Sequence, residues 1–380
     1  MHSFEPLQQE EEKPSPTKHR LVCYGAVLFF VLLLVLFLLP VALQSHQSCD
    51  SSLSASYSSG NRTVSYEMCA LHLLTNNPEF TSKEPDEITF LVFGDFGRDG
   101  FCCQRDVAWE MHRAAAGLIS FVVNTGDSFY VHGLRSAAKD EQVNTSFAHV
   151  YTTLGNLAQV PFYSVLGNHD YLGSAPEVLK LNHTTQLRMD GRFYSRTFSQ
   201  PDTGVVVLVV FLDTNPMIES YKQRTYDDHI SGVLPNQMLH DEDFEQQWGQ
   251  KVDEQVAFLE HELNHSSAHF NIVVGHHPIY SKQFAGMEDR STLYERISPL
   301  LDKYRVDLYL SGHEHNLQAV RVNFTLHLVS GAGSKMEPSN GHAKVDFYQT
   351  QSGFFHVSLL AGRRRPQVTA VDLWGKTTRL

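Results

Sequence analysis

Five short motifs in this chain share one pattern, in which an apolar run ends in glycine and a side chain able to bind a metal ion or move a proton follows. These motifs contain Asp, Asn, Tyr and several His residues, which offer oxygen and nitrogen donors but no thiolate. Such a donor set suits hard or borderline ions such as iron, zinc or manganese. A carboxylate can bridge two ions, and paired ions typically catalyse phosphoryl transfer. In chain order the motifs are Gly94-Asp95-Phe96-Gly97, Gly126-Asp127-Ser128-Phe129-Tyr130, Gly167-Asn168-His169-Asp170, Gly275-His276-His277-Pro278 and Gly312-His313-Glu314-His315.

Taken singly, each of these residues has a plain structural explanation. Asp127 could cap a helix, His169 could be a hydrogen-bonded residue in a turn, and Asn168 could supply a turn conformation. Five glycine-led strand ends in one chain argue against that explanation for the whole set. His313 and His315 are two residues apart, so both side chains point to the same side if the segment is extended.

Short apolar segments precede the motifs, and their Val, Ile and Phe content predicts buried strands. Apolar residues at helical spacing within 252–263 predict a helix. Alternating strands and helices indicate an α/β fold, whereas Gly353–Trp374 has strand character without helices and favours a more antiparallel, α+β ending. Ligands gather at the carboxyl ends of strands in such sheets, so the five motifs are expected to converge. The predicted strands are Ile88–Phe93, Ile119–Val123, Phe162–Val165, Val205–Leu212, Phe270–Val274, Val306–Leu310 and Thr325–Val329, and two more helices are predicted at Arg105–Ala116 and Leu293–Tyr304.

In this order, the five motifs resemble those of the calcineurin-like metallophosphoesterases. Most members of that superfamily carry Asp-x-His in the first motif, whereas Gly97 stands at the third position here and Tyr130 follows Asp127 by three residues. That exchange is similar to the purple acid phosphatases, and most of all to the small, mammalian-type, tartrate-resistant acid phosphatases. The similarity runs from about Ile88 to the C-terminus. It includes Phe211-Leu212-Asp213-Thr214 and Leu328-Val329-Ser330-Gly331-Ala332-Gly333.

The resemblance implies a four-layer αββα sandwich of the metallophosphoesterase type with a dinuclear, iron-containing centre. It implies that Asp127 bridges a ferric ion, Fe(3+), and a second, divalent ion, which could be Fe, Zn or Mn. It also implies that His169 is a catalytic residue near the substrate, where it could protonate the leaving alcohol. By motif match, Asp95, Asp127, Tyr130 and His315 would hold the ferric ion, and Asp127, Asn168, His276 and His313 the divalent ion.

The chain departs from the mammalian members of the family in two respects. Those members have another histidine a short way past the fourth motif, and Ser281-Lys282-Gln283-Phe284-Ala285 contains none. His277 is an additional candidate for a possible substrate contact. The apolar N-terminal segment described below is also not typical of the soluble, secreted members.

The activity that the resemblance implies is that of an acid phosphatase, which hydrolyses phosphate monoesters by direct attack of a metal-bound hydroxide. One alternative is a phosphodiesterase or nucleotide pyrophosphatase of the same superfamily, which Gly97 disfavours. Another is a non-enzymatic surface ectodomain, which the full set of predicted ligands disfavours. The formal net charge of −12 speaks against a nucleic-acid partner, because that would need a basic face. The substrate would be a phosphorylated small molecule or protein, and the oligomeric state stays open.

An uncharged run, Leu21–Leu43, is long enough to cross a bilayer at 1.5 Å rise per residue. Lys13, Lys18 and Arg20 precede it and the next basic residue is Arg62, which predicts a cytosolic N-terminus. A signal anchor is favoured over a cleaved signal peptide, whose apolar region is shorter. The chain is therefore predicted to be a single-pass, type II membrane protein with its catalytic domain outside the cell or in the lumen of an acidic compartment. The predicted regions are a cytosolic tail (1–20), a transmembrane signal anchor (21–43), a stalk (44–87) and a metallophosphoesterase domain (88–380).

Two further features agree with a lumenal or extracellular location. Cys49, Cys69, Cys102 and Cys103 would lie in an oxidising space. Adjacent cysteines rarely bond to each other, so Cys102 and Cys103 could each pair with Cys49 or Cys69, or remain free thiols. Five N-x-S/T sequons predict glycosylation, at Asn61, Asn144, Asn182, Asn264 and Asn323.

Overall fold

The computed structural model describes residues 55–59, 62–66, 87–101, 103–117, 119–183, 185–218, 252–283, 290–360 and 362–380. The chain divides into two compact units, Met1–Asn76 and Asn77–Leu380. In the first unit, β1 (Ala55–Ser59) pairs antiparallel with β2 (Arg62–Tyr66), so the segment predicted as a stalk contains a hairpin. The described part of the chain includes no helix with the length and apolarity needed to cross a membrane. The predicted tail and anchor (1–43) lie outside it.

The first sheet of the second unit contains the strands that lead into the first three motifs. Its strand order is β16-β15-β14-β3-β4-β5-β6. β3, β4, β5 and β6 are parallel to one another, whereas β14 pairs antiparallel with β3 and β15, and β16 pairs antiparallel with β15, as the C-terminal stretch predicts. The strands are β3 (Glu87–Phe93), β4 (Phe121–Asn124), β5 (Phe162–Ser164), β6 (Leu187–Arg188), β14 (Gly353–Leu360), β15 (Gln367–Asp372) and β16 (Thr377–Arg379).

The second sheet contains the strands that lead into the last two motifs. Its order is β13-β11-β12-β10-β9-β8-β7, with β8, β9, β10 and β12 parallel and the other three antiparallel to their neighbours. The strands are β7 (Tyr194–Gln200), β8 (Val205–Phe211), β9 (Phe270–Val274), β10 (Leu308–Ser311), β11 (Leu317–Val322), β12 (Thr325–Ser330) and β13 (Phe347–Gln349).

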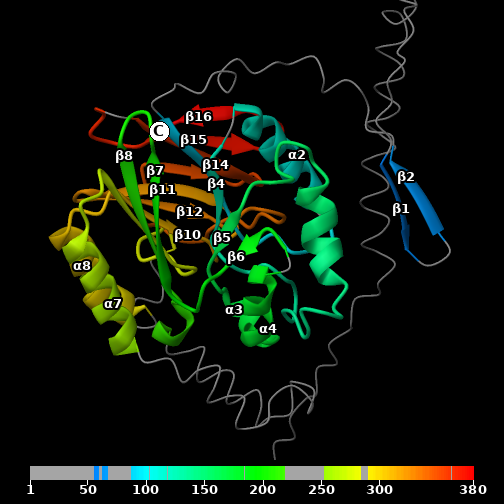
Figure 1. Ribbon diagram of the computed structural model, residues 1–380, viewed down its shortest axis with the longest axis horizontal. Coiled ribbons are helices and arrows are strands. Elements are labelled where there is room, and N and C mark those ends of the chain that lie inside the picture. The colour runs from blue at the N-terminus through cyan, green and yellow to red at the C-terminus, as the bar shows by residue number, and fades with distance from the viewer. Residues whose placement is uncertain are drawn as a thin grey trace, which may run out of the picture. The chain divides into compact units, whose positions relative to one another are not determined.

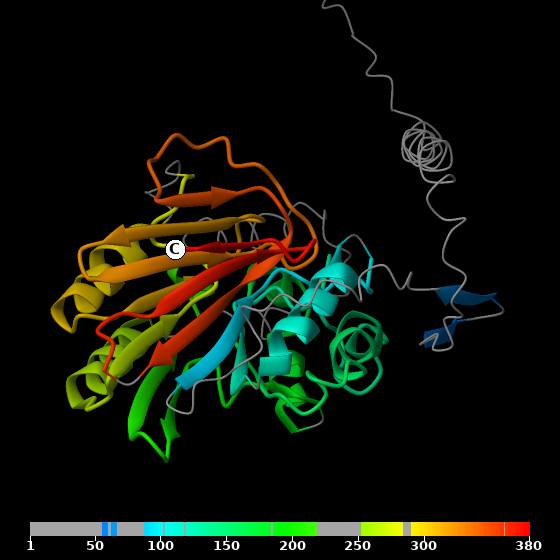
Figure 2. The same ribbon diagram turned by 90° about the horizontal axis from the view of Figure 1, so that it is seen from above.

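Helices cover the outer faces of the two sheets (Figures 1 and 2). α2 (Gln104–Ala114) packs on β14 and β15 of the first sheet. α7 (Val252–His265) and α8 (Ser298–Lys303) bury Leu259, Leu263 and Leu301 with apolar side chains of β8, β9 and β10. The other helical segments are α3 (Asn168–Leu172), α4 (Ala175–Lys180), the 3-10 helices Ala115–Gly117, Leu181–His183 and Asn215–Met217, and the π-helices Val143–Thr152 and Leu293–Ile297.

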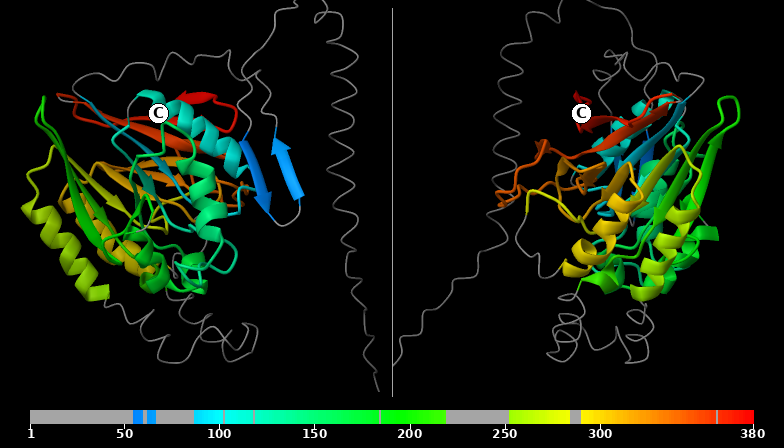
Figure 3. Two further views of the ribbon diagram at one scale, coloured as in Figure 1. Left: turned by 45° about the vertical axis from the view of Figure 1, so that its right-hand side comes forward. Right: turned by 90° about the vertical axis from the view of Figure 1, so that its left-hand side faces the viewer.

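The largest apolar core lies between the sheets and under α2. Phe121 of β4 stacks on Phe90 of its own sheet and on Phe198 of the second sheet, with ring centroids 4.8 and 4.0 Å apart. Buried aromatic pairs of this kind stabilise a core beyond the area that they bury. The layers therefore run helix, sheet, sheet, helix, and Figure 3 shows the two sheets packed between the helices. This arrangement of two mixed sheets is the predicted α+β, αββα architecture.

Candidate metal centre

The five motifs meet at one end of the two sheets. They follow β3, β4 and β5 of the first sheet and β9 and β10 of the second. Backbone hydrogen bonds join neighbouring motifs: Asp95 N–H donates to the Gly126 carbonyl, and Gly312 N–H donates to the His276 carbonyl, each at 2.9 Å. The convergence expected from the strand ends therefore occurs, and it brings both sheets to one site.

The backbone is tightly constrained where the predicted ligands stand. Asp95, Asp127 and His313 have φ angles of 58°, 52° and 68°, a left-handed region that costs a non-glycine residue about 1–3 kcal/mol. A Cβ on Gly167 would lie 2.1 Å from Asp127 Oδ1, and one on Gly312 would lie 2.3 Å from Asp95 Oδ2. Glycine is therefore required at both positions so that the backbone can approach the carboxylates.

Two carboxylates, a phenol and an imidazole form one half of the site, which we call the carboxylate half. The Tyr130 hydroxyl donates to Asp127 Oδ2 at 2.8 Å and lies 3.1 Å from both Asp95 Oδ1 and His315 Nε2. Burial raises the pKa of Tyr130 well above its ordinary value, and the Asp127 and Asp95 carboxylates raise it further. The Arg98 guanidinium, 3.8 Å from the centre of the ring, lowers the pKa but does not offset these causes.

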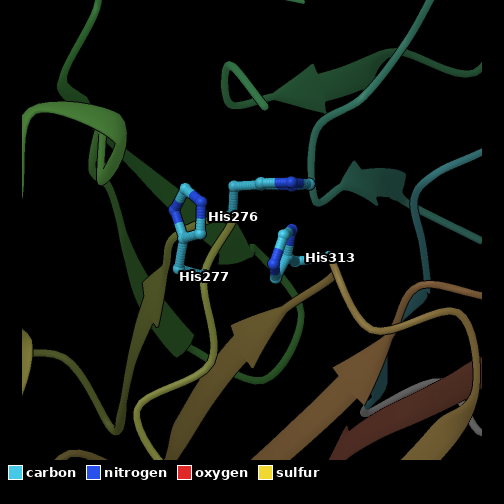
Figure 4. Close-up of side chains that lie close together, drawn as sticks. All are labelled: His276, His277 and His313. Carbon is cyan, nitrogen blue, oxygen red and sulfur yellow. The ribbon is translucent and has the colours of Figure 1, made fainter. Parts of the chain in front are cut away.

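An amide and two imidazoles form the other half, which we call the histidine half. Asn168 Oδ1 lies 3.1 Å from both His276 Nε2 and His313 Nδ1. His276 Nδ1 lies 2.8 Å from the Thr125 carbonyl, which can only accept, so Nδ1 carries the proton and Nε2 faces the site. Figure 4 shows the His276 and His277 rings, which follow β9, close to the ring of His313, which follows β10.

Asp127 lies between the two halves. Its Oδ2 is 2.8 Å from the Tyr130 hydroxyl and 3.5 Å from His276 Nε2, while its Oδ1 accepts the His169 backbone N–H at 2.8 Å. Burial alone would raise the pKa of Asp127, but His276 and His169 lower it below its ordinary value. Burial would lower the pKa of His276, but the Asp127 carboxylate raises it to about 9. The carboxylate is thus ionised and placed where it could bridge two ions.

The donor set fits a pair of metal ions. Two overlapping groups of described residues have ligand atoms within 4.8 Å of one another. Both offer oxygen and nitrogen donors alone, as hard or borderline ions prefer. The groups are Asp95, Asp127 and His276, and His276, His277 and His313.

The predicted catalytic residue His169 lies at the edge of the site. Its ring is partly exposed and packs against Tyr130, with centroids 4.3 Å apart. Nδ1 lies 2.6 Å from the Val131 carbonyl, which can only accept, so Nδ1 is the protonated nitrogen and Nε2 is the one able to exchange a proton.

Asp170 has a supporting position that sequence reasoning missed. Its buried carboxylate accepts the backbone N–H groups of Ser128 at 3.1 Å and Gly167 at 2.9 Å, so it ties the second motif to the third. Burial, together with the Asp127 carboxylate, raises its pKa to about 8. Its place in the third motif was the available signal, but its two partners become visible only when the loops are adjacent.

His277, the additional candidate for substrate contact, is buried against Thr214. It is 1% exposed, and its Nδ1 lies 2.8 Å from Thr214 Oγ1, which also accepts its backbone N–H at 3.1 Å. This residue does not border the cleft described next. His277 therefore supports the histidine half. Its contact with substrate stays a prediction.

A cleft of about 300 Å³ opens over the site. Five predicted site residues border it, together with seven residues for which the sequence predicted no role. The site residues are Asp127, Asn168, His169, His313 and His315; the others are Gln283, Arg290, Glu314, Asn316, Glu337, Pro338 and Ser339.

Four of the predicted glycosylation sites fall in the described residues. Asn144, Asn264 and Asn323 are exposed and Asn182 is partly exposed, so all four are accessible, and their modification stays a prediction. Asn61, Cys49, Cys69 and Cys102 lie outside the described residues, so cysteine pairing also stays a prediction.

Comparison with known proteins connects this site to others. The calcineurin-like phosphoesterase family model matches residues 88–317. Purple acid phosphatase 4 of Arabidopsis thaliana is 36% identical over 263 residues, which are 67% of this chain and 70% of that protein. Tartrate-resistant acid phosphatase type 5 of Homo sapiens is 28% identical over 318 residues, which are 79% of this chain and 92% of that protein. The similarity thus extends to both plant and mammalian proteins.

Solved structures share the architecture. GAP50, the anchor in the inner membrane complex of Plasmodium, superimposes with a TM-score of 0.58 at 24% identity, covering 78% of this chain and 89% of that one. Purple acid phosphatase PPD1 from yellow lupin (Lupinus luteus) seeds has a TM-score of 0.53 at 14% identity, covering 78% and 53%. At these identities the likeness shows the fold.

Proposed function

The chain belongs to the calcineurin-like phosphoesterases and, within them, to the purple acid phosphatases, and on this premise we propose that it is an acid phosphatase with a dinuclear metal centre that hydrolyses phosphate monoesters. The resemblance in the five motifs is confirmed at the level of the family. The observation that carries the proposal is the position of Asp127 Oδ2, between the Tyr130 phenol and the His276 imidazole.

The ligand assignment follows from the two halves. The carboxylate half, with Asp95, Asp127, Tyr130 and His315, would hold Fe(3+), because anionic oxygen donors suit a highly charged ion. The histidine half, with Asn168, His276 and His313, would share Asp127 and hold a divalent Fe, Zn or Mn ion. When bound, such ions act as Lewis acids and lower the pKa of water.

The protein's own charges favour a phosphate at the loaded centre. Asp95, Asp127 and an ionised Tyr130 bring three negative charges, fewer than the five positive charges of a ferric and a divalent ion. The positive charge that remains on the loaded centre would attract a phosphate ester locally, even though the chain has a formal net charge of −12.

His169 would move the proton that the reaction needs. The Val131 carbonyl accepts the Nδ1–H at 2.6 Å, so this contact holds the ring in one orientation in either protonation state. Nε2 is then the atom from which a protonated ring donates to the departing alcohol.

The location remains the one that the N-terminal sequence favours. We propose a type II membrane protein anchored by residues 21–43, with its catalytic domain outside the cell or in an acidic lumen. The exposed sequon asparagines support this side of the membrane. The substrate would be a phosphorylated small molecule or protein, with no nucleic-acid partner.

Metal analysis, a visible spectrum and ester selectivity test the proposal together on the detergent-solubilised chain. We expect two metal ions per chain, at least one of them iron, a visible charge-transfer band, and faster hydrolysis of p-nitrophenyl phosphate than of bis(p-nitrophenyl) phosphate. Faster hydrolysis of the bis-ester would instead indicate a phosphodiesterase. A colourless, metal-free chain that added iron does not activate would indicate a non-enzymatic ectodomain.

A further inference from the structure

The cleft over the centre is bordered by charged side chains of both signs. On the Tyr130 side, Glu337 lies 3.6 Å from His315 (Oε2 to Nδ1). On the other side stands Arg290, which is the single Lys or Arg among the described residues that border the cleft. Lys335 pairs with Glu337 and Glu314 pairs with Arg290, so what distinguishes Arg290 is that it is a cation bordering the cleft itself.

Arg290 is held in place before any substrate arrives. Its side chain is 15% exposed, its Nη1 donates to the Pro278 carbonyl at 3.2 Å, and its Nη2 donates to Glu314 Oε1 at 3.2 Å. Glu314 is held in turn, because it accepts hydrogen bonds from Ser281 Oγ and from Gln318 Nε2. A guanidinium fixed in this way loses little side-chain freedom when it binds an anion.

The guanidinium keeps donors for another group. It has five N–H donors, and its acceptors among the described residues are the Pro278 carbonyl, Ser281 Oγ and the Glu314 carboxylate. Among the described residues, Nε–H and the second hydrogen of Nη2 have no acceptor. Two such donors suit a carboxylate or phosphate, which can accept both at once.

The position of Arg290 relates it to the reaction. Its partner Glu314 stands between His313 and His315, and the same cleft is bordered by Asn168 and His169. A molecule whose phosphate lies at the centre can therefore reach Arg290 with a second group within the same cleft.

We propose that Arg290 is a specificity-determining residue that binds a second anionic group of the substrate, so that the preferred substrates are phosphate monoesters carrying a further carboxylate or phosphate. This inference rests on the proposed phosphatase function. The competing explanation is a purely structural ion pair that ties the fourth motif to the fifth. That explanation predicts equal effects of mutation on all substrates.

Three aryl esters separate the two explanations on the full, metal-loaded chain: phenyl phosphate, 4-carboxyphenyl phosphate and 1,4-phenylene bisphosphate. We expect the wild-type KM to be lower for the two esters with a second charge, and their ranking shows whether carboxylate or phosphate is preferred. Arg290→Gln should raise these two KM values by about ten-fold, the size of one charge-assisted contact. Any change in kcat or in the KM for phenyl phosphate should be shared by all three esters, so the ratio of each KM to that for phenyl phosphate is the quantity tested, and Arg290→Lys should be intermediate.

Binding without turnover provides an independent measurement. Calorimetry should show that Arg290→Gln weakens 3-phosphonopropionate about ten-fold and leaves the apolar analogue propylphosphonate unchanged. Arg296→Gln is the matched control, since Arg296 is 40% exposed, pairs with Asp253 at 2.7 Å and does not border the cleft. This control should alter none of these values.

The inference is overturned if wild-type KM values do not favour the doubly charged esters, or if Arg290→Gln affects all three esters equally or removes metal. If Arg290→Gln does not fold, the wild-type ranking and Arg290→Lys decide. If the wild-type chain hydrolyses none of the esters, the phosphatase proposal fails, while the phosphonate pair still decides whether Arg290 binds a second anion.

Discussion

The carboxylate half and the histidine half of the centre are built from different donors and held by different contacts. In the carboxylate half, backbone N–H groups donate to the acids: His313 N–H lies 3.1 and 3.0 Å from the two Asp95 oxygens. In the histidine half, a ring N–H donates outward to a backbone oxygen, as His276 does to Thr125. Each half therefore has supports that match the charge of its donors.

The largest effect is expected from the residue common to both halves. Asp127→Asn keeps the shape of the side chain but removes the charge that could bridge two ions, and its amide would face the Tyr130 hydroxyl and His276. Turnover should fall on the order of a thousand-fold, as for other residues that act as a unit. Metal analysis should show loss from both halves. Near-normal activity with two ions bound would show that Asp127 is not a ligand shared by the two halves.

A smaller loss is expected from His169, which lies beside both halves. His169→Ala should lower kcat by about 100- to 1,000-fold, as expected for a proton donor, while metal content stays the same. Atomic absorption and steady-state kinetics would measure the two quantities. His261→Ala, at an exposed position on α7, is the control and should change neither. Metal loss in the His169 variant would make this residue a ligand rather than a proton donor.

Tyr130 tests the carboxylate half alone. Tyr130→Phe removes the hydroxyl that contacts Asp127, Asp95 and His315. The visible band should disappear, and turnover should fall by about ten-fold, because one of several charged contacts is lost. Tyr151→Phe, which changes a buried tyrosine of the apolar core, should keep the colour. A band that survives Tyr130→Phe would place the ferric site elsewhere.

A last effect concerns acid stability next to the histidine half. His327 packs against Tyr280 and Tyr309, with ring centroids 4.8 and 5.4 Å away, and the Tyr309 hydroxyl donates to the His277 carbonyl. Burial lowers the pKa of His327 to about 3. Because the folded pKa lies below the unfolded value of about 6.5, the stability from this residue is present above pH 6.5 and is lost as pH falls toward 3.

The free energy of unfolding should therefore fall with acid by up to about 1.4 kcal/mol per pH unit from this group alone. His327→Phe should flatten that slope between pH 6.5 and 4, as measured by denaturant unfolding at several pH values. His342→Gln, at an exposed position, should leave the slope as it is. An equal slope in the parent and the His327 variant would mean that acid weakens another region first.

Several elements of the fold follow from local sequence signals. β3, β8 and β9 begin and end within one residue of their predicted bounds, because apolar runs bounded by glycine or polar residues are strand signals in themselves. β7, β11 and β13 were not predicted. The burial patterns of β7 and β13 show strands that are partly exposed and therefore lack a continuous apolar run.

By itself, the sequence determined which donors are present and that they follow strand ends, because residue type and glycine position are local properties. Tertiary structure alone decided which donors share a half, that His277 faces Thr214, and that Asp170 and Arg290 support or border the centre. The contact between Arg290 and Glu314 joins positions 24 residues apart, and that between Asp170 and Ser128 joins positions 42 apart. Such contacts depend on how two sheets pack, and no periodicity along the chain encodes that packing.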